Sequence, residues 1–156
     1  KRFKAPESWF YPGALLKDKT KMFIGKSNCD VGVFVNRGFV KASNVIVVID
    51  SERDLFLLDY TSTLLKTTHG SVGILDRSSS TTPGSEKIQH AIHQFTESIK
   101  QASLIADKDM SAATFSSYNF MLISYDSWND VSEHRREALQ KMPSTLILNH
   151  KERTEE

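Results

Sequence analysis

Five consecutive β-branched residues, Val-Ile-Val-Val-Ile at positions 45–49, constrain the fold of this chain more than any other feature. Such an unbroken run is typical of a parallel strand covered on both faces, because a strand with one face in water alternates apolar and polar residues. The run ends at Asp50. Ser51 and Asp54 then have the spacing of a capping box at the start of a helix. A buried strand that leads directly into a helix predicts an α/β domain.

Short apolar runs alternate with amphipathic segments along the rest of the chain. Residues 86–99 show the helical pattern most clearly, because four large apolar side chains repeat there with a helical period. The predicted strands are 29–35, 45–49, 72–75, 103–106, 120–123 and 145–148, and the predicted helices are 51–67, 86–99 and 131–142, with a short helix or a loop at 110–117. This order predicts an open, mostly parallel sheet with helices on both faces.

The net charge of +1 over 156 residues, the length of one ordinary domain, hides an uneven distribution. Residues 1–28 carry seven basic and two acidic residues, which gives this leader +5 and leaves −4 for the remainder. A basic leader fits either a solvated linker or a weak contact with an anionic lipid surface. The balanced total gives no reason to expect a nucleic acid partner. We divide the chain into a basic leader or linker (1–28), an α/β domain (29–150) and a charged tail (151–156), and expect a soluble part of a longer polypeptide.

The residue types that carry most enzyme chemistry are sparse in this sequence. Cys29 is the one cysteine, which excludes an intrachain disulfide, and the neighbouring Asp30 disfavours a thiolate, so we expect a structural thiol. His90 and His93 have a spacing that metal sites use, but both point away from the apolar stripe of their helix and should face solvent. His134 is expected to pack beside the apolar stripe of the last helix. Without a nucleophile elbow or a glycine-rich phosphate loop, we expect no enzyme activity, metal or cofactor.

Two acidic turns at the predicted carboxyl edge of the sheet are the best candidates for a ligand site. Ligands of open α/β sheets bind beyond the carboxyl ends of the strands, where the strand order reverses. Asp50 and Ser51 follow the strand at 45–49, and Asp126 follows the strand at 120–123. A carboxylate there could accept hydrogen bonds from a ribose or an adenine amine, and it could equally cap a helix or shape a turn. Both interpretations stay open from the sequence.

Two stretches of the chain resemble known families. Residues 45–52, Val-Ile-Val-Val-Ile-Asp-Ser-Glu, resemble the first strand and turn of universal stress proteins, and the later elements are similarly spaced over about residues 44–150. Residues 29–38, Cys-Asp-Val-Gly-Val-Phe-Val-Asn-Arg-Gly, resemble a segment in the cytosolic tails of plant and fungal monovalent cation/proton antiporters. In those tails the segment lies between two tandem domains similar to universal stress proteins. The chain is most similar to the second half of such a tail in fungal potassium/proton antiporters.

The resemblance implies a regulatory, non-catalytic cytosolic domain whose transporting residues lie in a membrane domain outside this chain. Its partners would be that membrane domain and the tandem sister domain, with a homodimer as a further option, at an endomembrane (Golgi or endosome) or the plasma membrane. The resemblance also implies that the strand at 29–35 pairs antiparallel with residues 145–149 at the edge of the sheet. The residues expected at this interface are Val31, Val33, Val35, Leu146 and Leu148.

The alternative function is the binding of a small molecule such as an adenine nucleotide, as in universal stress proteins that bind nucleotides. Asp50 matches an acidic position of that family. Those proteins carry a Gly-x-x-Gly, nine-residue, Gly-Ser/Thr phosphate motif after their fourth strand, whereas this chain has no glycine from Tyr125 through Pro143. Backbone amides cannot approach phosphates as closely without such glycines, so we do not expect nucleotide binding by the usual mode.

Overall fold

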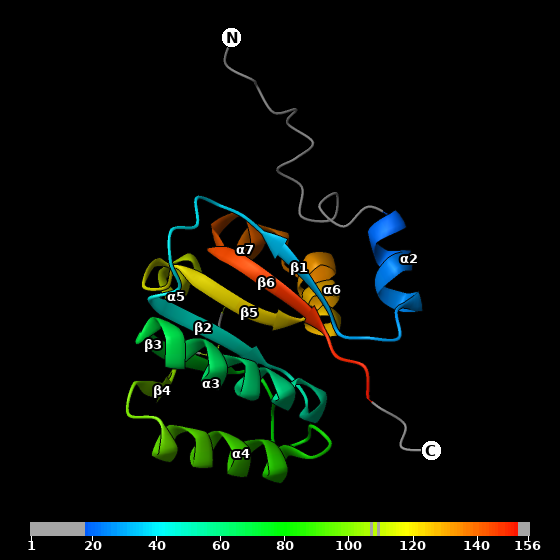
Figure 1. Ribbon diagram of the computed structural model, residues 1–156. Coiled ribbons are helices and arrows are strands. Elements are labelled where there is room, and N and C mark those ends of the chain that lie inside the picture. Colours follow the sequence, from blue (N-terminus) through cyan, green and yellow to red (C-terminus); the bar gives the residue numbers. More distant parts are fainter. Residues whose placement is uncertain (1–17, 107, 109, 153–156) are drawn as a thin grey trace.

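The unbroken apolar run forms strand β2 in the interior of a six-stranded sheet in the computed structural model, which describes residues 18–106, 108 and 110–152 (Figure 1). The strands are β1 (Val31–Val35), β2 (Asn44–Ile49), β3 (Ser71–Asp76), β4 (Ala102–Leu104), β5 (Phe120–Ser124) and β6 (Ser144–Asn149). Their order is β1-β6-β5-β2-β3-β4, and every neighbouring pair is parallel except β1 and β6. The predicted open, mostly parallel α/β sheet is therefore confirmed.

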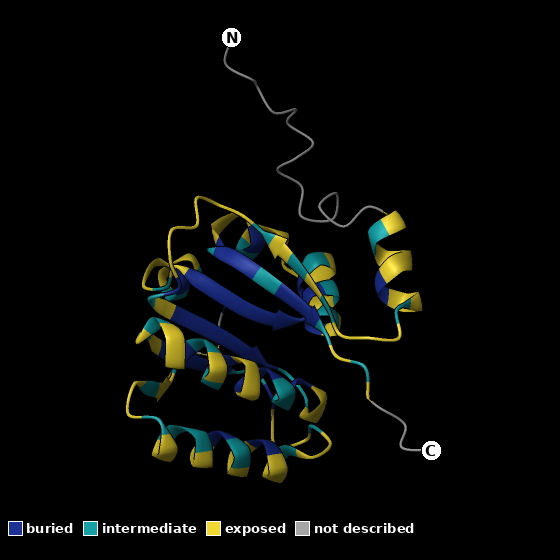
Figure 2. Ribbon diagram, in the orientation of Figure 1, coloured by how far each residue is buried: buried dark blue, intermediate teal, exposed yellow. Residues whose placement is uncertain are grey.

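Helices cover both faces of this sheet (Figure 1). They are α2 (Asp18–Lys26), the 3-10 helix η2 (Glu52–Leu55), α3 (Phe56–Thr68), α4 (Ser85–Ser98), α5 (Ala112–Ser116), α6 (Tyr125–His134) and α7 (Arg136–Lys141). The side chains of β2 alternate between two apolar clusters, one under α3 and α4 and the other under α5 to α7. All five apolar side chains of the run at 45–49 are fully buried, as a strand covered on both faces requires. Figure 2 shows the buried residues concentrated in the central strands.

The edge strand β1 pairs antiparallel with β6, as the resemblance implied. Val31 lies opposite Asn149 and Val35 lies opposite Thr145, so the predicted partner segment 145–149 is confirmed. Val33 and Val35 pack into the cluster on the α6 and α7 face, whereas Leu146 and Leu148 belong to the opposite face of the sheet. The five residues expected at this interface therefore lie in paired strands, but they divide between the two faces.

The last predicted helix is two helices in the structure. The first, α6, begins earlier than predicted, because Ser124 caps it by accepting a hydrogen bond from the backbone N–H of Ser127 at 3.2 Å. The helix is interrupted at Arg135, whose backbone is not helical (φ −136°, ψ 53°). The bend allows Val131 of α6 and Leu139 of α7 to enter the same buried cluster. One uninterrupted helix over 131–142 was therefore wrong.

Part of the basic leader is helical and attached to the domain. Ile24 of α2 is 2% exposed, and its carbonyl accepts a hydrogen bond from the Asn149 side chain at 3.5 Å. The Lys151 ammonium donates to the carbonyl of Gly25 at 3.4 Å. The aromatic part of the leader and the last residues of the charged tail lie outside the described residues. No helix in the described part of the chain is long and apolar enough to span a membrane.

Candidate functional site

The predicted ligand edge lies where the strand order reverses. After β2 the chain forms β3 and β4 on one side of β2, and it then returns to form β5 on the other side. The switch point therefore lies between β2 and β5. Asp50 and Ser51 follow β2, and Asp126 is in the first turn of α6, directly after β5. The structure therefore brings all three predicted residues to the same edge of the sheet.

Asp50 is already engaged by an arginine of the chain itself. The Arg77 guanidinium lies 3.2 Å from each oxygen of the Asp50 carboxylate and 3.8 Å from the Asp130 carboxylate. Arg77 follows β3, its backbone N–H donates to Ile49 at 2.8 Å, and its side chain is 14% exposed. Burial raises the pKa of the Asp50 carboxyl, and the charge of Arg77 opposes that shift. Arg77 therefore provides the positive charge that pairs with the Asp50 carboxylate.

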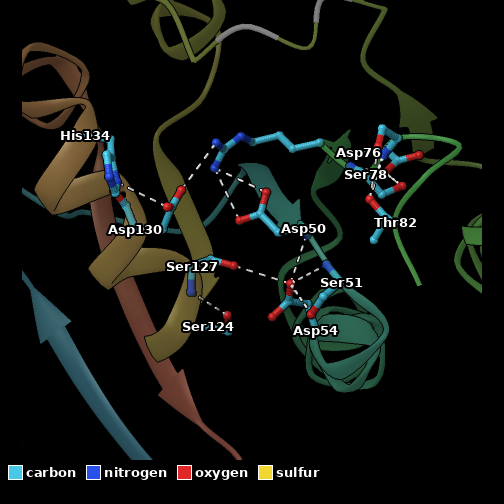
Figure 3. Close-up of polar contacts among 12 residues, drawn as sticks. Asp50, Ser51, Asp54, Asp76, Ser78, Thr82, Ser124, Ser127, Asp130 and His134 are labelled. Carbon is cyan, nitrogen blue, oxygen red and sulfur yellow. Dashed lines mark hydrogen bonds and ion pairs between the residues drawn. The ribbon is translucent and has the colours of Figure 1, made fainter. Parts of the chain in front are cut away.

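The ion-pair chain continues along α6 (Figure 3). Asp130 lies 3.2 Å from the Nδ1 atom of His134, one helical turn later. The His134 side chain is 68% exposed, so the expectation that it packs beside the apolar stripe was wrong. His134 lies in the last turn of α6, directly before the interruption at Arg135. The ring faces water and shares Asp130 with Arg77.

Asp54, rather than Asp50, performs the capping at the carboxyl end of β2. Its carboxylate accepts hydrogen bonds from the backbone N–H groups of Asp50 and Ser51, both at 2.9 Å, and from the Ser127 hydroxyl at 3.3 Å (Figure 3). The predicted pairing of Ser51 with Asp54 is confirmed. Asp54 is 2% exposed, and these contacts join η2 to α6 across the switch point. Ser51 therefore has a structural partner at this edge.

The three predicted site residues do not face a common cavity. Asp126 lines a cavity of about 330 Å³ beyond β5 and β6, while Ser51 lines a neighbouring cavity of about 620 Å³ beside α4. Asp50 lines neither of these two cavities, because it faces Arg77. Arg53 and His150 line both cavities. The edge is therefore polar and hollowed, but the predicted residues Asp50, Ser51 and Asp126 do not line one common cavity.

A second polar cluster, which the sequence did not indicate, surrounds Asp30 at the start of β1. The Asp30 carboxylate accepts hydrogen bonds from the Tyr60 hydroxyl at 2.8 Å and from the backbone N–H of Lys151 at 3.0 Å, and it lies 3.0 Å from Nδ1 of His150. The bond from Lys151, followed by that from His150, lowers the pKa of Asp30 to about 2. His150 also stacks on Phe56 with ring centroids 4.9 Å apart. These contacts link the residue before β1 to α3 and to the residues that follow β6.

The residues considered for metal or redox chemistry are dispersed on the surface. His90 and His93 are exposed, as predicted, and His93 lies 3.2 Å from Glu97. Cys29, expected to be a structural rather than a reactive thiol, is a free thiol and is exposed. Within the described residues, no group of three histidine, cysteine or acidic side chains is arranged to hold a metal ion.

An apolar groove lies between α3 and the sheet. It encloses about 450 Å³ and is lined by Asp59, Tyr60, Thr63, Leu64, Thr67, Phe120, Leu122 and Leu146. Beside it, the rings of Phe34, Phe39 and Phe120 contact one another, with centroids 5.3 to 6.2 Å apart. Phe34 and Phe39 are 46% and 39% exposed. We call this surface, the groove and the two exposed phenylalanines, the α3-side face.

The sequence did not reveal the α3-side face, because its members come from β1, the loop after β1, α3, β5 and β6 and meet only in the folded chain. Comparisons with known proteins gave no match to a protein-family model, to a curated protein or to a solved structure. The site geometry and the resemblance of residues 29–38 and 45–52 are therefore the basis for a functional proposal.

Proposed function

We propose that this chain is a regulatory and interaction domain of a membrane potassium (or sodium)/proton antiporter. It acts through contacts with other domains and catalyses nothing itself. Its place is the cytosolic side of an endomembrane or of the plasma membrane, below transport helices of the same polypeptide. The antiparallel pairing of β1 with β6 supports the proposal, because residues 29–38, which carry the resemblance, form β1 and the turn after it.

The α3-side face is the observation that carries this proposal. The helices α3 and α4 lie on the β2, β3 and β4 side of that face, with α3 also packed against β5, and among the described residues no helix lies over β6 and β1 there (Figure 1). A sheet of this kind is ordinarily covered on both faces, so an exposed apolar groove marks an interaction surface. We assign it to another domain of the same polypeptide, the tandem sister domain or the membrane domain. A second copy of the chain is the other partner that would fit it.

Adenine-nucleotide binding has less support than an interaction role. The Asp50 carboxylate is already paired with Arg77, and it lines neither of the two cavities at this edge. The turn from β5 into α6 contains no glycine that would let backbone amides approach a phosphate. The switch point is therefore best described as a structural junction of β2, β3 and α6.

The reading frame that encodes this chain tests the proposal. We expect several hydrophobic segments of about 20 residues each upstream of Lys1, since each must cross a bilayer as a helix. A second α/β domain should lie between those segments and the present chain. A complete reading frame without hydrophobic segments upstream would contradict the assignment to an antiporter.

A further inference from the structure

Helix α2 has two sharply different sides. With about 100° of rotation per residue, Lys19, Met22, Phe23 and Lys26 fall within about 100° of arc, and Ile24 points in nearly the opposite direction. Ile24 is 2% exposed, whereas Met22 and Phe23 are 55% and 65% exposed. The helix thus anchors itself through one buried side chain. We call the side formed by Lys19, Met22, Phe23 and Lys26 the outward face of α2.

The attachment of α2 leaves this outward face open. Hydrogen bonds join α2 to the body through Asn149 and Lys151, at the carboxyl end of β6. Figure 1 shows α2 beside the layers of the domain rather than within them, and Figure 2 shows most of its surface exposed. A nine-residue helix is marginal in water by itself, so an exposed phenylalanine and methionine on it need a physical explanation.

The composition of the outward face matches a lipid–water interface better than a protein interface. Protein interfaces have few lysines at their core. Along the helix, Lys19 lies about one turn before Met22 and Lys26 about one turn after Phe23, so the apolar groups can enter a lipid interface while the flexible lysine stems extend toward lipid phosphates. The charge of the whole leader has the same sign, since residues 1–28 carry +5. Negative lipid is therefore the complementary partner.

We propose that the outward face of α2 contacts an anionic membrane surface, with Phe23 and Met22 in the interfacial layer and Lys19 and Lys26 on lipid phosphates. The biological setting of this contact rests on the proposed function, because a domain held beneath a membrane already has a high effective concentration there. Such a small face binds weakly by itself, as one-signal membrane contacts do. It orients the domain and does not anchor it.

Binding of the full 156-residue chain to lipid vesicles tests the inference. We expect the chain to co-sediment at low ionic strength with phosphatidylcholine vesicles that contain about a third phosphatidylserine, and not with phosphatidylcholine alone. Phe23→Ser should weaken binding about tenfold, since it removes the largest apolar group from the interface. The double variant Lys19→Gln, Lys26→Gln should weaken it about 30-fold, because each basic residue near anionic lipid contributes about a factor of five.

The matched control is the double variant Lys66→Gln, Lys100→Gln. It changes the net charge by the same amount at exposed positions on the body of the domain. We expect this control to bind within about twofold of the parent, with the residual change arising from long-range charge alone. Circular dichroism shows whether each variant is folded, and Phe23 is exposed enough for its replacement to be tolerated.

Four results would overturn the inference: no binding to anionic vesicles, equal binding to zwitterionic vesicles, full binding by Phe23→Ser, or equal losses in the lysine pair and its control. If Phe23→Ser binds as well as the parent, the lipid contact belongs to residues before α2. If the chain binds no lipid but self-associates, and Phe23→Ser abolishes that self-association, the partner of the outward face is a second copy of the chain. The proposed function would survive any of these results, because the reading frame and ion flux test it separately.

Discussion

At the scale of single residues, Arg77 decides what the switch point can do. Its guanidinium holds Asp50 and Asp130 at the position where open α/β sheets usually bind ligands. Removing one partner of a buried ion pair costs more than the pair contributes, because the remaining charge is left without compensation. Arg77 is therefore a structural side chain that pairs with Asp50 at this edge, and Asp50 lines neither of the two cavities there.

Replacing Arg77 with methionine should lower the free energy of unfolding by about 2 kcal/mol near neutral pH. This is less than the usual cost of breaking a fully buried ion pair, because the Asp50 side chain is 25% exposed. Burial raises the pKa of Asp50, so this carboxyl becomes protonated above the usual range of aspartate and then needs no cation. The loss should therefore shrink as the pH falls. Urea denaturation over a pH series measures it, and a loss that grows in acid would contradict the account.

The Asp30 cluster should also lose its contribution in acid, but at lower pH than the Arg77–Asp50 pair, because the pKa of Asp30 is lowered and that of Asp50 is raised. The pKa of Asp30 is lowered to about 2, so its contribution to stability is complete above the ordinary value of 3.8 and disappears as the pH falls toward 2. Asp30→Asn should cost about 1 kcal/mol near neutral pH, a modest value because the carboxylate is 37% exposed, and only a small part of that at pH 2, where Asp30 is partly protonated. Denaturant melts at both pH values check this. Asp59→Asn on the exposed side of α3 is the control, and an equal loss there would reject a specific role for Asp30.

At the scale of elements, the sequence pattern predicted what depends on local periodicity. The β-branched run became β2, the residues from 86 onward became α4, and the edge strand found its antiparallel partner. The pattern failed at the end of the chain, where the start of α6 depends on a cap at Ser124 and its end on burying Val131 and Leu139 together. Those determinants are tertiary contacts, which periodicity does not encode.

The sheet order predicts a gradient of hydrogen exchange. Amides of β2 and β5 should exchange slowest, because both strands are paired on two sides and buried. Amides of β1 should be intermediate, since this strand is paired with β6 alone among the described strands, and those of α2 should exchange fastest. Exchange followed by mass spectrometry measures the order. Exchange of β1 as fast as that of α2 would contradict a stable antiparallel edge.

At the scale of the whole molecule, the sequence predicted at which edge of the sheet the candidate site lies, but not which side chains contact one another there. Asp50, Ser51 and Asp126 do lie at one edge, because the carboxyl ends of parallel strands meet there. The partner of Asp50 follows β3, and the Asp30 cluster joins residues as far apart as 30 and 150. Which carboxylate meets which cation depends on the packing of distant elements, and so does the α3-side face. A single sequence carries no signal for such contacts.

A structural role for the switch point predicts that adenine nucleotides leave the melting temperature unchanged. A ligand at 100 times its dissociation constant would stabilise the fold by about 2.7 kcal/mol, which a thermal shift detects easily. We expect no shift with ATP or AMP at millimolar concentration, for the parent chain and for Asp126→Asn alike. A clear upward shift in the parent chain would contradict a purely structural role for this edge and would favour the nucleotide-binding alternative.

The most direct test of the central claim is cation-driven proton flux in vesicles that contain the full-length protein. Thr63→Arg with Thr67→Arg places charge on exposed positions of the α3-side face, and His90→Arg with Gln94→Arg does so on exposed positions of α4 as a control. We predict potassium- or sodium-driven flux in the parent, a change of about threefold or more in the α3-side variant, and no change in the control. Flux no greater than in protein-free vesicles, or identical flux in all three proteins, would contradict the account.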